Sequence, residues 1–75
     1  SFAQTPASQA ITGLVTDATD RSPLPGVTVV VRGTTVGATT GPDGRFSLNL
    51  PAGSSTLLVS FVGYESQTVD AAAGP

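Results

Sequence analysis

The sequence predicts a small all-β sandwich of about six to seven short strands. Apolar and polar residues alternate over short stretches, which directs the apolar side chains to one face of each strand. Glycine and proline clusters separate these stretches at short, regular intervals. No stretch has the period of an amphipathic helix. The 75 residues allow a single domain with a thin core.

The expected domain covers residues 10–70. Residues 1–9 lack periodicity and contain a proline, so we expect a tail there, and residues 71–75 form a second tail of small residues. Small Ser1 and Ala3 have the spacing found before a signal-peptide cleavage site. The first tail is interpreted either as the remnant of such a signal or as an unstructured leader. Because the sequence contains no Met, we expect a processed protein or an excised fragment.

The first expected strand spans residues 10–17, where β-branched side chains are frequent. Residues 21–26 form a turn, in which Pro25 fixes φ and Gly26 permits a positive φ. Residues 27–32 are the most regular strand. One of its faces carries three valines that we expect in the core: Val27, Val29 and Val31.

A short strand is expected at residues 38–40. The Asp43-Gly44 pair that follows favours a tight hairpin turn. Residues 45–50 alternate cleanly between apolar and polar side chains, and the apolar ones are expected to point inward. These are Phe46, Leu48 and Leu50.

Apolar residues are nearly continuous from 56 to 62, which is typical of a central strand buried on both faces. Val59 lies in its middle. Gly63 interrupts the run, and we expect a β-bulge there that lets the Tyr64 ring cover an edge of the sandwich beside Phe61. A more polar final strand follows, as far as residue 70.

The composition argues against an enzyme. The chain contains no His, Cys or Lys, so the usual general bases and activated nucleophiles are missing. The net charge is −2 and the three arginines are scattered, which does not provide the basic stripe that nucleic acid requires. No apolar run approaches the ~20 residues of a membrane helix. We therefore expect no catalytic residue, no cofactor, no metal, no nucleic-acid partner and no membrane insertion.

Two acidic motifs have a simpler structural interpretation. Asp17 and Asp20 resemble a carboxylate pair, but they lie in a predicted loop and are interpreted as solvated turn residues. Asp43 resembles a residue of a calcium loop. However, Thr40 and Gly41 occupy other ligand positions and no bidentate Glu follows, so the turn is the preferred interpretation.

Several motifs follow one another in a fixed order. They are ITGLVTD at 11–17, PLPGVTV at 23–29, RGTT at 32–35, GATT at 37–40, DGRFSL at 43–48 and LVSFVGY at 58–64, followed by QTV at 67–69. This series resembles the carboxypeptidase-regulatory-like domain, a prealbumin-like Greek-key sandwich. It is most similar to the copy at the N-terminus of SusC/RagA-type TonB-dependent outer-membrane transporters of Bacteroidetes-like bacteria. The resemblance covers about residues 10–69. It implies a periplasm-facing, non-catalytic module ahead of a plug and barrel, near the energy-transducing partner.

The resemblance ends at the C-terminus. Members of the family usually continue into one more strand, whereas this chain runs into residues 71–75. Without that strand the sandwich would have an unpaired edge that invites strand addition. Two functions therefore stay open. The chain is either an exported transporter module that acts through protein–protein contact at the periplasm or outer membrane, or a structural subunit of an extracellular filament. In the filament, residues 1–9 would be the donor strand, although Pro6 opposes this role.

Overall fold

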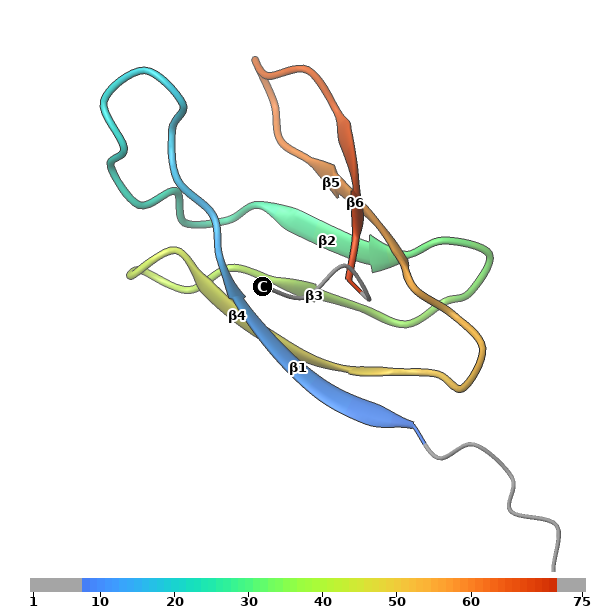
Figure 1. Ribbon diagram of the computed structural model, residues 1–75. Helices are drawn as coiled ribbons and strands as arrows, with labels where there is room; N and C mark the ends of the chain where they lie inside the picture. Colours follow the sequence, from blue (N-terminus) through green and yellow to red (C-terminus); the bar gives the residue numbers. More distant parts are fainter. Residues whose placement is uncertain (1–7, 72–75) are drawn as a thin grey trace, which may run out of the picture.

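The computed structural model describes residues 8–71 as two β-sheets that pack face to face (Figure 1). The strands are β1 (Gln9–Leu14), β2 (Thr28–Val31), β3 (Gly37–Thr39), β4 (Arg45–Leu50), β5 (Thr56–Ser60) and β6 (Gln67–Asp70). β1 and β4 form a two-stranded sheet, and the other strands form a four-stranded sheet in the order β3-β2-β5-β6. All neighbouring strands are antiparallel. The predicted all-β sandwich is thus confirmed, whereas the interpretation of Ser1 and Ala3 lies outside the described residues.

The centre of the larger sheet is β2, which pairs with β3 on one side and β5 on the other. Val27, just before the strand, is 1% exposed, and Val29 and Val31 are fully buried. The intervening Thr28 is exposed, as the period of a strand requires. Fully burying one valine side chain contributes roughly 1.5–3 kcal/mol. This row of valines is therefore the main apolar contribution of the larger sheet.

The smaller sheet covers the valine row. Leu48 and Leu50 of β4 are buried against Val29, Val31 and Leu57. Two half-buried side chains complete the core from the same sheet: Ile11 and Phe46. The alternate residues of β4 are exposed, so its clean alternation in the sequence corresponds to one buried and one solvated face.

The larger sheet departs from the sequence prediction at β5, which ends at Ser60 and has only one buried face. Leu57 is 5% exposed, whereas its neighbour Leu58 is 41% exposed. β5 is central in the sheet, between β2 and β6, but among residues 8–71 no second layer covers its outer face. The prediction of burial on both faces from residue 56 to 62 was therefore wrong. An antiparallel sheet tolerates apolar side chains on a solvated face, so an apolar run does not establish two-sided burial.

The predicted Asp43-Gly44 turn is present, but the hairpin is not. The Gly44 N–H donates to the Gly41 carbonyl at 2.9 Å, and Gly44 has φ +76°. The Arg45 N–H donates to Asp43 Oδ1 at 3.0 Å. β3 and β4 on either side of this turn do not pair with each other, because β3 pairs with β2 and β4 with β1. The turn therefore carries the chain from one sheet to the other.

Removing the Phe46 ring should destabilise the fold. We expect Phe46→Ala to lower the free energy of unfolding by about 3 kcal/mol, the lower end for a Phe→Ala change, because the ring is half-buried. Ser47→Ala, the next residue on the exposed face of β4, is the matched control and should change stability by less than about 0.5 kcal/mol. Urea unfolding measures both. Equal midpoints for the two variants would contradict the assignment of Phe46 to the core.

Gly44 should tolerate a side chain less well than another glycine of the same conformation. Gly44 and Gly53 have φ +76° and φ +80°. A Cβ at Gly44 would lie 2.7 Å from the Val15 carbonyl oxygen, whereas a Cβ at Gly53 meets no atom within 4 Å. We expect Gly53→Ala to cost about 1 kcal/mol of unfolding free energy, and Gly44→Ala about 2 kcal/mol more. Equal losses of unfolding free energy for the two variants, measured by urea unfolding, would contradict this prediction. The structure would then relieve the close contact between the new Cβ and the Val15 carbonyl without loss of stability.

Candidate functional site

An apolar cleft opens between β1 and β6, where the smaller sheet leaves part of the larger sheet uncovered. Its volume is about 410 Å³. The floor is formed by β5 and β6 through Leu57, Val59 and Val69, and Ile11 of β1 lines the side. Val69 is 44% exposed although it pairs with the buried Leu57 on the inner face of the sheet. The larger sheet therefore extends past the edge of the smaller one, and its core face is open to solvent there.

β1 presents an open backbone edge above this cleft. The Val15 N–H donates to the Gly44 carbonyl at 2.8 Å. In an antiparallel pair, every second residue directs its backbone N–H and C=O toward the partner strand, and this bond identifies which residues of β1 do so. The backbone groups of Ile11 and Gly13 therefore face β4. The groups that face the open side are those of Ala10, Thr12 and Leu14. Within residues 8–71, no strand pairs with this side.

Within β1 itself, the open edge lacks the sequence features that protect against strand addition. Gln9–Leu14 contains no charged residue and no proline, and its pairing with β4 is continuous without a bulge. Charges, prolines and bulges are the features that normally block an added strand. An uncharged extended segment therefore meets both free backbone groups and apolar side chains at this place.

Gly13 and Phe46 form the wall of the cleft together. A Cβ at Gly13 would overlap the Phe46 ring at the atoms Cε1 and Cζ. The ring therefore lies across the glycine on the neighbouring strand, and both residues line the cleft. A glycine in a strand often marks such a close approach, so this signal was present in the sequence but was not used.

A second feature lies at the end of the sandwich to which the loops of residues 15–26 and 61–66 both project (Figure 1). A hydrogen bond joins these loops. The Tyr64 hydroxyl donates to Asp17 Oδ2 at 2.6 Å. The Tyr64 ring lies 5.6 Å from the Phe61 ring, measured between centroids. The Tyr64 N–H also donates to the Phe61 carbonyl at 3.1 Å. The side chain of Tyr64 thus ties two loops together.

The structure corrects the sequence prediction for Gly63 and Tyr64. Gly63 has φ +86° and lies in the tight turn closed by Phe61 and Tyr64, not in a β-bulge. Tyr64 is 47% exposed and contacts a loop rather than a strand edge. The loop partner of Tyr64, Asp17, could not be inferred from local patterns because it lies far away in the sequence.

Hydrogen bonds in these loops shift three pKa values. The Tyr64 hydroxyl, followed by the Thr19 N–H at 2.7 Å, lowers the pKa of Asp17. The same bond to Asp17, with smaller contributions from desolvation and from the charges of Asp17 and Asp20, raises the pKa of Tyr64. The pKa of Asp20 is lowered by the Ser22 N–H at 2.9 Å and by the Ser22 hydroxyl at 2.7 Å. Asp17 and Asp20 are thus ionised acceptors that hold loop backbone.

The structural residues singled out in the sequence occupy four settings. The buried ones are Val27, Val29, Val31 and Leu48. The half-buried ones are Phe46, Val59 and Phe61. The turns contain Pro25, Gly26, Asp43, Gly44 and Gly63, and Tyr64 lies on the surface beside the last turn.

Thr40 is a buried polar residue that the sequence analysis missed. It is 5% exposed, and its hydroxyl accepts the Val27 N–H at 2.9 Å and donates to the Leu24 carbonyl at 2.6 Å. These bonds hold the turn before β2 against the end of β3. No local sequence signal distinguishes Thr40 from the neighbouring threonines.

The described residues present surfaces on which contacts can form. In residues 8–71, no three His, Cys, Asp or Glu side chains are grouped to hold a metal ion. The same residues include no helix with the length and apolar character to cross a membrane. Arg45 and Asp43 form an exposed ion pair at 3.8 Å. The features that remain are an open strand edge, an apolar cleft and an end where two loops are tied together.

The Tyr64–Asp17 hydrogen bond should make stability depend on pH at two ends. The lowered pKa of Asp17 contributes stability above its ordinary value of 3.8, and this contribution is lost as the pH falls through the lowered pKa. The raised pKa of Tyr64 contributes stability below its ordinary value of 10.0, and this is lost as the pH rises through the raised pKa. The melting temperature of the chain should therefore exceed that of Tyr64→Phe between these values, and the gap should narrow outside them.

Asp20→Asn is the control for this pH dependence. Asp20 accepts its hydrogen bonds from Ser22, and its charge is the smallest contribution to the raised pKa of Tyr64, so the variant should retain most of the alkaline loss of stability that Tyr64 causes. A constant difference between the chain and Tyr64→Phe from acid to alkaline pH would show that the hydrogen bond does not link the titration of these groups to folding.

Comparison with known proteins identifies the family. The profile described as CarboxypepD_reg-like domain matches residues 11–74. The chain is 46% identical over 50 residues to "TonB-dependent receptor P39" of Formosa agariphila, which covers 67% of the chain and 5% of the receptor. It is 43% identical over 63 residues to "TonB-dependent receptor SusC" of Bacteroides thetaiotaomicron, which covers 84% of the chain and 6% of the receptor. The match therefore spans only a small part of these long relatives, and no solved structure matches the chain significantly. The chain belongs to the CarboxypepD_reg-like domain family.

Proposed function

We propose that this chain is a non-catalytic module of a TonB-dependent outer-membrane receptor, on the periplasmic side, and that it acts through protein–protein contact. The similarity to TonB-dependent receptors supports the setting, because the match covers most of this chain and only 5–6% of each receptor. A match of that proportion is expected for a small domain attached to a much larger protein. The sequence contains no His, Cys or Lys, so the usual general bases and activated nucleophiles of enzymes are missing.

The observation that carries the contact function is the open edge of β1 above an uncovered apolar floor. An added strand could pair with the backbone of Ala10, Thr12 and Leu14 while its inward side chains cover Val59 and Val69. Backbone pairing supplies affinity, and the alternate side chains supply specificity. The module would therefore take up an uncharged extended segment of the receptor or of a protein bound to it.

The shape of the cleft favours a single extended segment over a second folded sandwich. Its floor belongs to β5 and β6, so the larger sheet projects beyond β1. If a second copy approached so that its β1 paired with this β1, the larger sheet of that copy would collide with β6 of this one. The two β1 strands could then not come close enough to pair. A lone segment carries no second sheet and avoids this collision.

Self-assembly into an extracellular filament is a second candidate, because the uncharged edge of β1 would also accept a segment from a neighbouring copy. The donor would be residues 1–9, of which 1–7 lie outside the described residues and Gln9 already pairs with Leu50 in β1. Pro6 lacks the N–H that a paired strand donates, which weakens this segment as a donor. The receptor module is therefore the preferred function.

Hydrogen exchange tests the contact function. The amides of Ala10, Thr12 and Leu14 should exchange rapidly in the isolated chain, because they face the open side of β1. In a complete receptor that carries this module, we expect the same amides to be at least about tenfold more protected. Equal exchange in the two proteins would contradict the use of this edge.

Two proline variants provide the matched control. Thr12 and Ser47 lie opposite each other in the β1–β4 ladder, and the alternation directs the backbone of each away from the partner strand. Thr12→Pro removes the N–H on the open edge of β1, whereas Ser47→Pro removes one on the other edge of the same sheet. In the receptor, only Thr12→Pro should lower uptake at an unchanged amount of barrel in the outer membrane. Equal effects would refute a role of the β1 edge.

A further inference from the structure

We propose that the pocket at the loop end of the sandwich binds an aliphatic side chain of a partner polypeptide that carries Lys or Arg beside it. The inference rests on the proposed function, because it assigns a partner class to a module that acts through contact. Val59 borders both this pocket and the cleft beside β1, but Ala18 and Glu65, which are varied below, line only this pocket, so each proposal can be tested without the other.

The pocket is half-open, apolar inside and has a volume of about 110 Å³. Its interior is lined by Leu24, Val27, Val59 and Phe61. A cavity of about 150 Å³ is large enough for benzene, so a pocket of this volume suits a side chain of the size of valine or leucine. The exposed Tyr64 and Glu65 stand on its rim. An aliphatic group that entered would therefore meet apolar walls and a polar border.

The wall of the pocket is already held in place. Tyr64 is fixed by its hydrogen bond to Asp17 at 2.6 Å and by its ring contact with Phe61. Thr40 holds the backbone of Val27 and Leu24 on the opposite wall. A preorganised wall does not lose further conformational entropy when a ligand binds, which favours affinity. These contacts distinguish the pocket from a hollow between mobile loops.

An apolar side chain at the tip of the adjacent turn extends the contact surface. Val62 follows Phe61 in the turn before Tyr64 and is 91% exposed. Phe61 and Val62 also line a shallow groove beside the pocket, together with Gly26. A segment bound in the pocket would thus find a second apolar contact without any change of the fold.

The charge distribution indicates what should flank the aliphatic group. Asp17, Asp20 and Glu65 lie in the loops of this end, where Arg21 is the one basic residue, so this end carries the whole net charge of −2. The remaining charges balance: they are Asp43 and Asp70 against Arg32 and Arg45.

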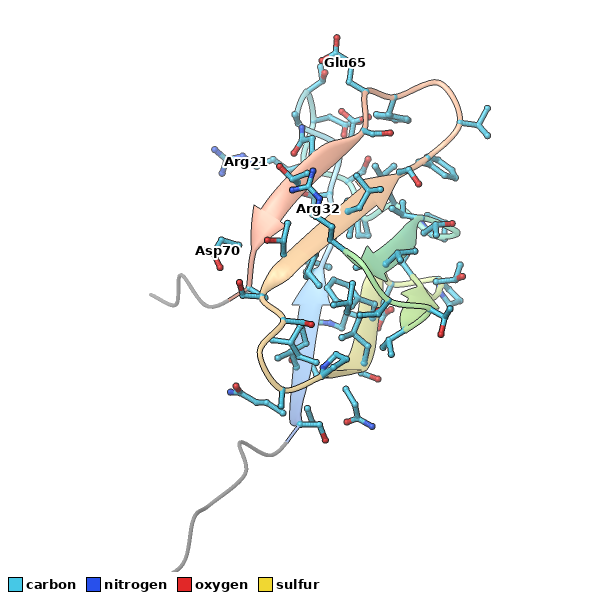
Figure 2. All side chains as sticks on the ribbon, turned by 90° about the vertical axis from the view of Figure 1, so that its right-hand side faces the viewer. Arg21, Arg32, Glu65 and Asp70 are labelled. Carbon is cyan, nitrogen blue, oxygen red and sulfur yellow. The ribbon has the colours of Figure 1, made fainter. Side chains whose placement is uncertain are left out.

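Among these acids, Glu65 is the one placed to meet a partner. Asp17 and Asp20 already accept hydrogen bonds within their own loops and from Tyr64. Glu65 forms no ion pair with another of residues 8–71, and Figure 2 shows it at the tip of the molecule, pointing away from the ribbon. A basic side chain next to the bound aliphatic group would meet Glu65, whereas an acidic one would be repelled. Nucleic acid and anionic lipid surfaces are disfavoured for the same reason.

Peptide titration of the 75-residue chain, followed by NMR, tests the proposal. The probe contains Lys-Leu-Lys between glycines, and its controls contain Lys-Ser-Lys and Glu-Leu-Glu. We expect the first peptide to shift the amide signals of Phe61, Val62 and Glu65, and each control to bind at least about tenfold more weakly. Equal binding of Lys-Leu-Lys and Lys-Ser-Lys would overturn the proposal, since charge alone would then explain it.

Two variants of the pocket and one control variant locate the site. Glu65→Gln should weaken Lys-Leu-Lys binding about threefold to tenfold and reduce its dependence on salt. Asp43→Asn removes the same charge from the Arg45 pair at a different turn and should leave binding unchanged. Ala18→Phe, at an exposed position on the pocket lining, should block binding without unfolding the chain. Equal effects of Glu65→Gln and Asp43→Asn would overturn the proposal. Neither outcome changes the expected hydrogen exchange along β1, so failure here would leave the proposed function standing.

Discussion

Burial of one face of β2 is the constraint on which the rest of the structure depends. Val29 and Val31 are completely removed from solvent, which requires a second layer directly over them. That layer is β1 and β4: β4 supplies Leu48 and Leu50, and β1 supplies Ile11. Two strands are enough to cover the centre of a four-stranded sheet but not its full width. The cleft beside β1 is therefore a consequence of the cover that residues 8–71 provide, which has only two strands.

The end of the sandwich meets the same requirement in a different way. Val27 lies before β2 begins, beyond the cover of Leu48 and Leu50, yet it is 1% exposed. Loops enclose it there: Leu24 and Phe61 lie around it, and the Thr40 hydroxyl accepts its N–H. Loops pack less completely than strands, so they leave a pocket whose walls are nevertheless fixed by hydrogen bonds. The pocket thus lies where the valine row extends past its cover, whereas the cleft beside β1 lies where the larger sheet is wider than its cover.

Much of the fold could be predicted because its signals are local. The alternation in β2 and β4 identified both strands and their buried faces, and the positive φ of Gly44 agrees with the Asp-Gly turn. The partner of a strand is not a local property. For this reason the turn at Asp43 was expected to close a hairpin, although β4 pairs with β1.

The candidate site was less predictable for the same physical reason. The contact between Tyr64 and Asp17 joins residues 47 positions apart, and no periodicity connects them. The sequence does not show that Leu58 lies on the exposed face of β5, since an apolar residue has the same hydropathy whether it is exposed or buried. An open edge was anticipated only from the resemblance to a family, whereas its position beside β1 required the three-dimensional arrangement.

The pairing of β1 with β4 affects the order of events during synthesis. Gln9 pairs with Leu50, and β2 and β3 lie between them in the chain, so the smaller sheet cannot form until the turn that leads to β4 has been made. When the chain is synthesised from its N-terminus, β1 therefore has no partner strand until β4 has been made, and the larger sheet is also incomplete during this time. Contacts this distant in sequence also slow the folding reaction. During that interval both edges of the uncharged strand β1 can pair with another chain. The time until β4 is synthesised and pairs with β1 then determines how far aggregation competes with native pairing.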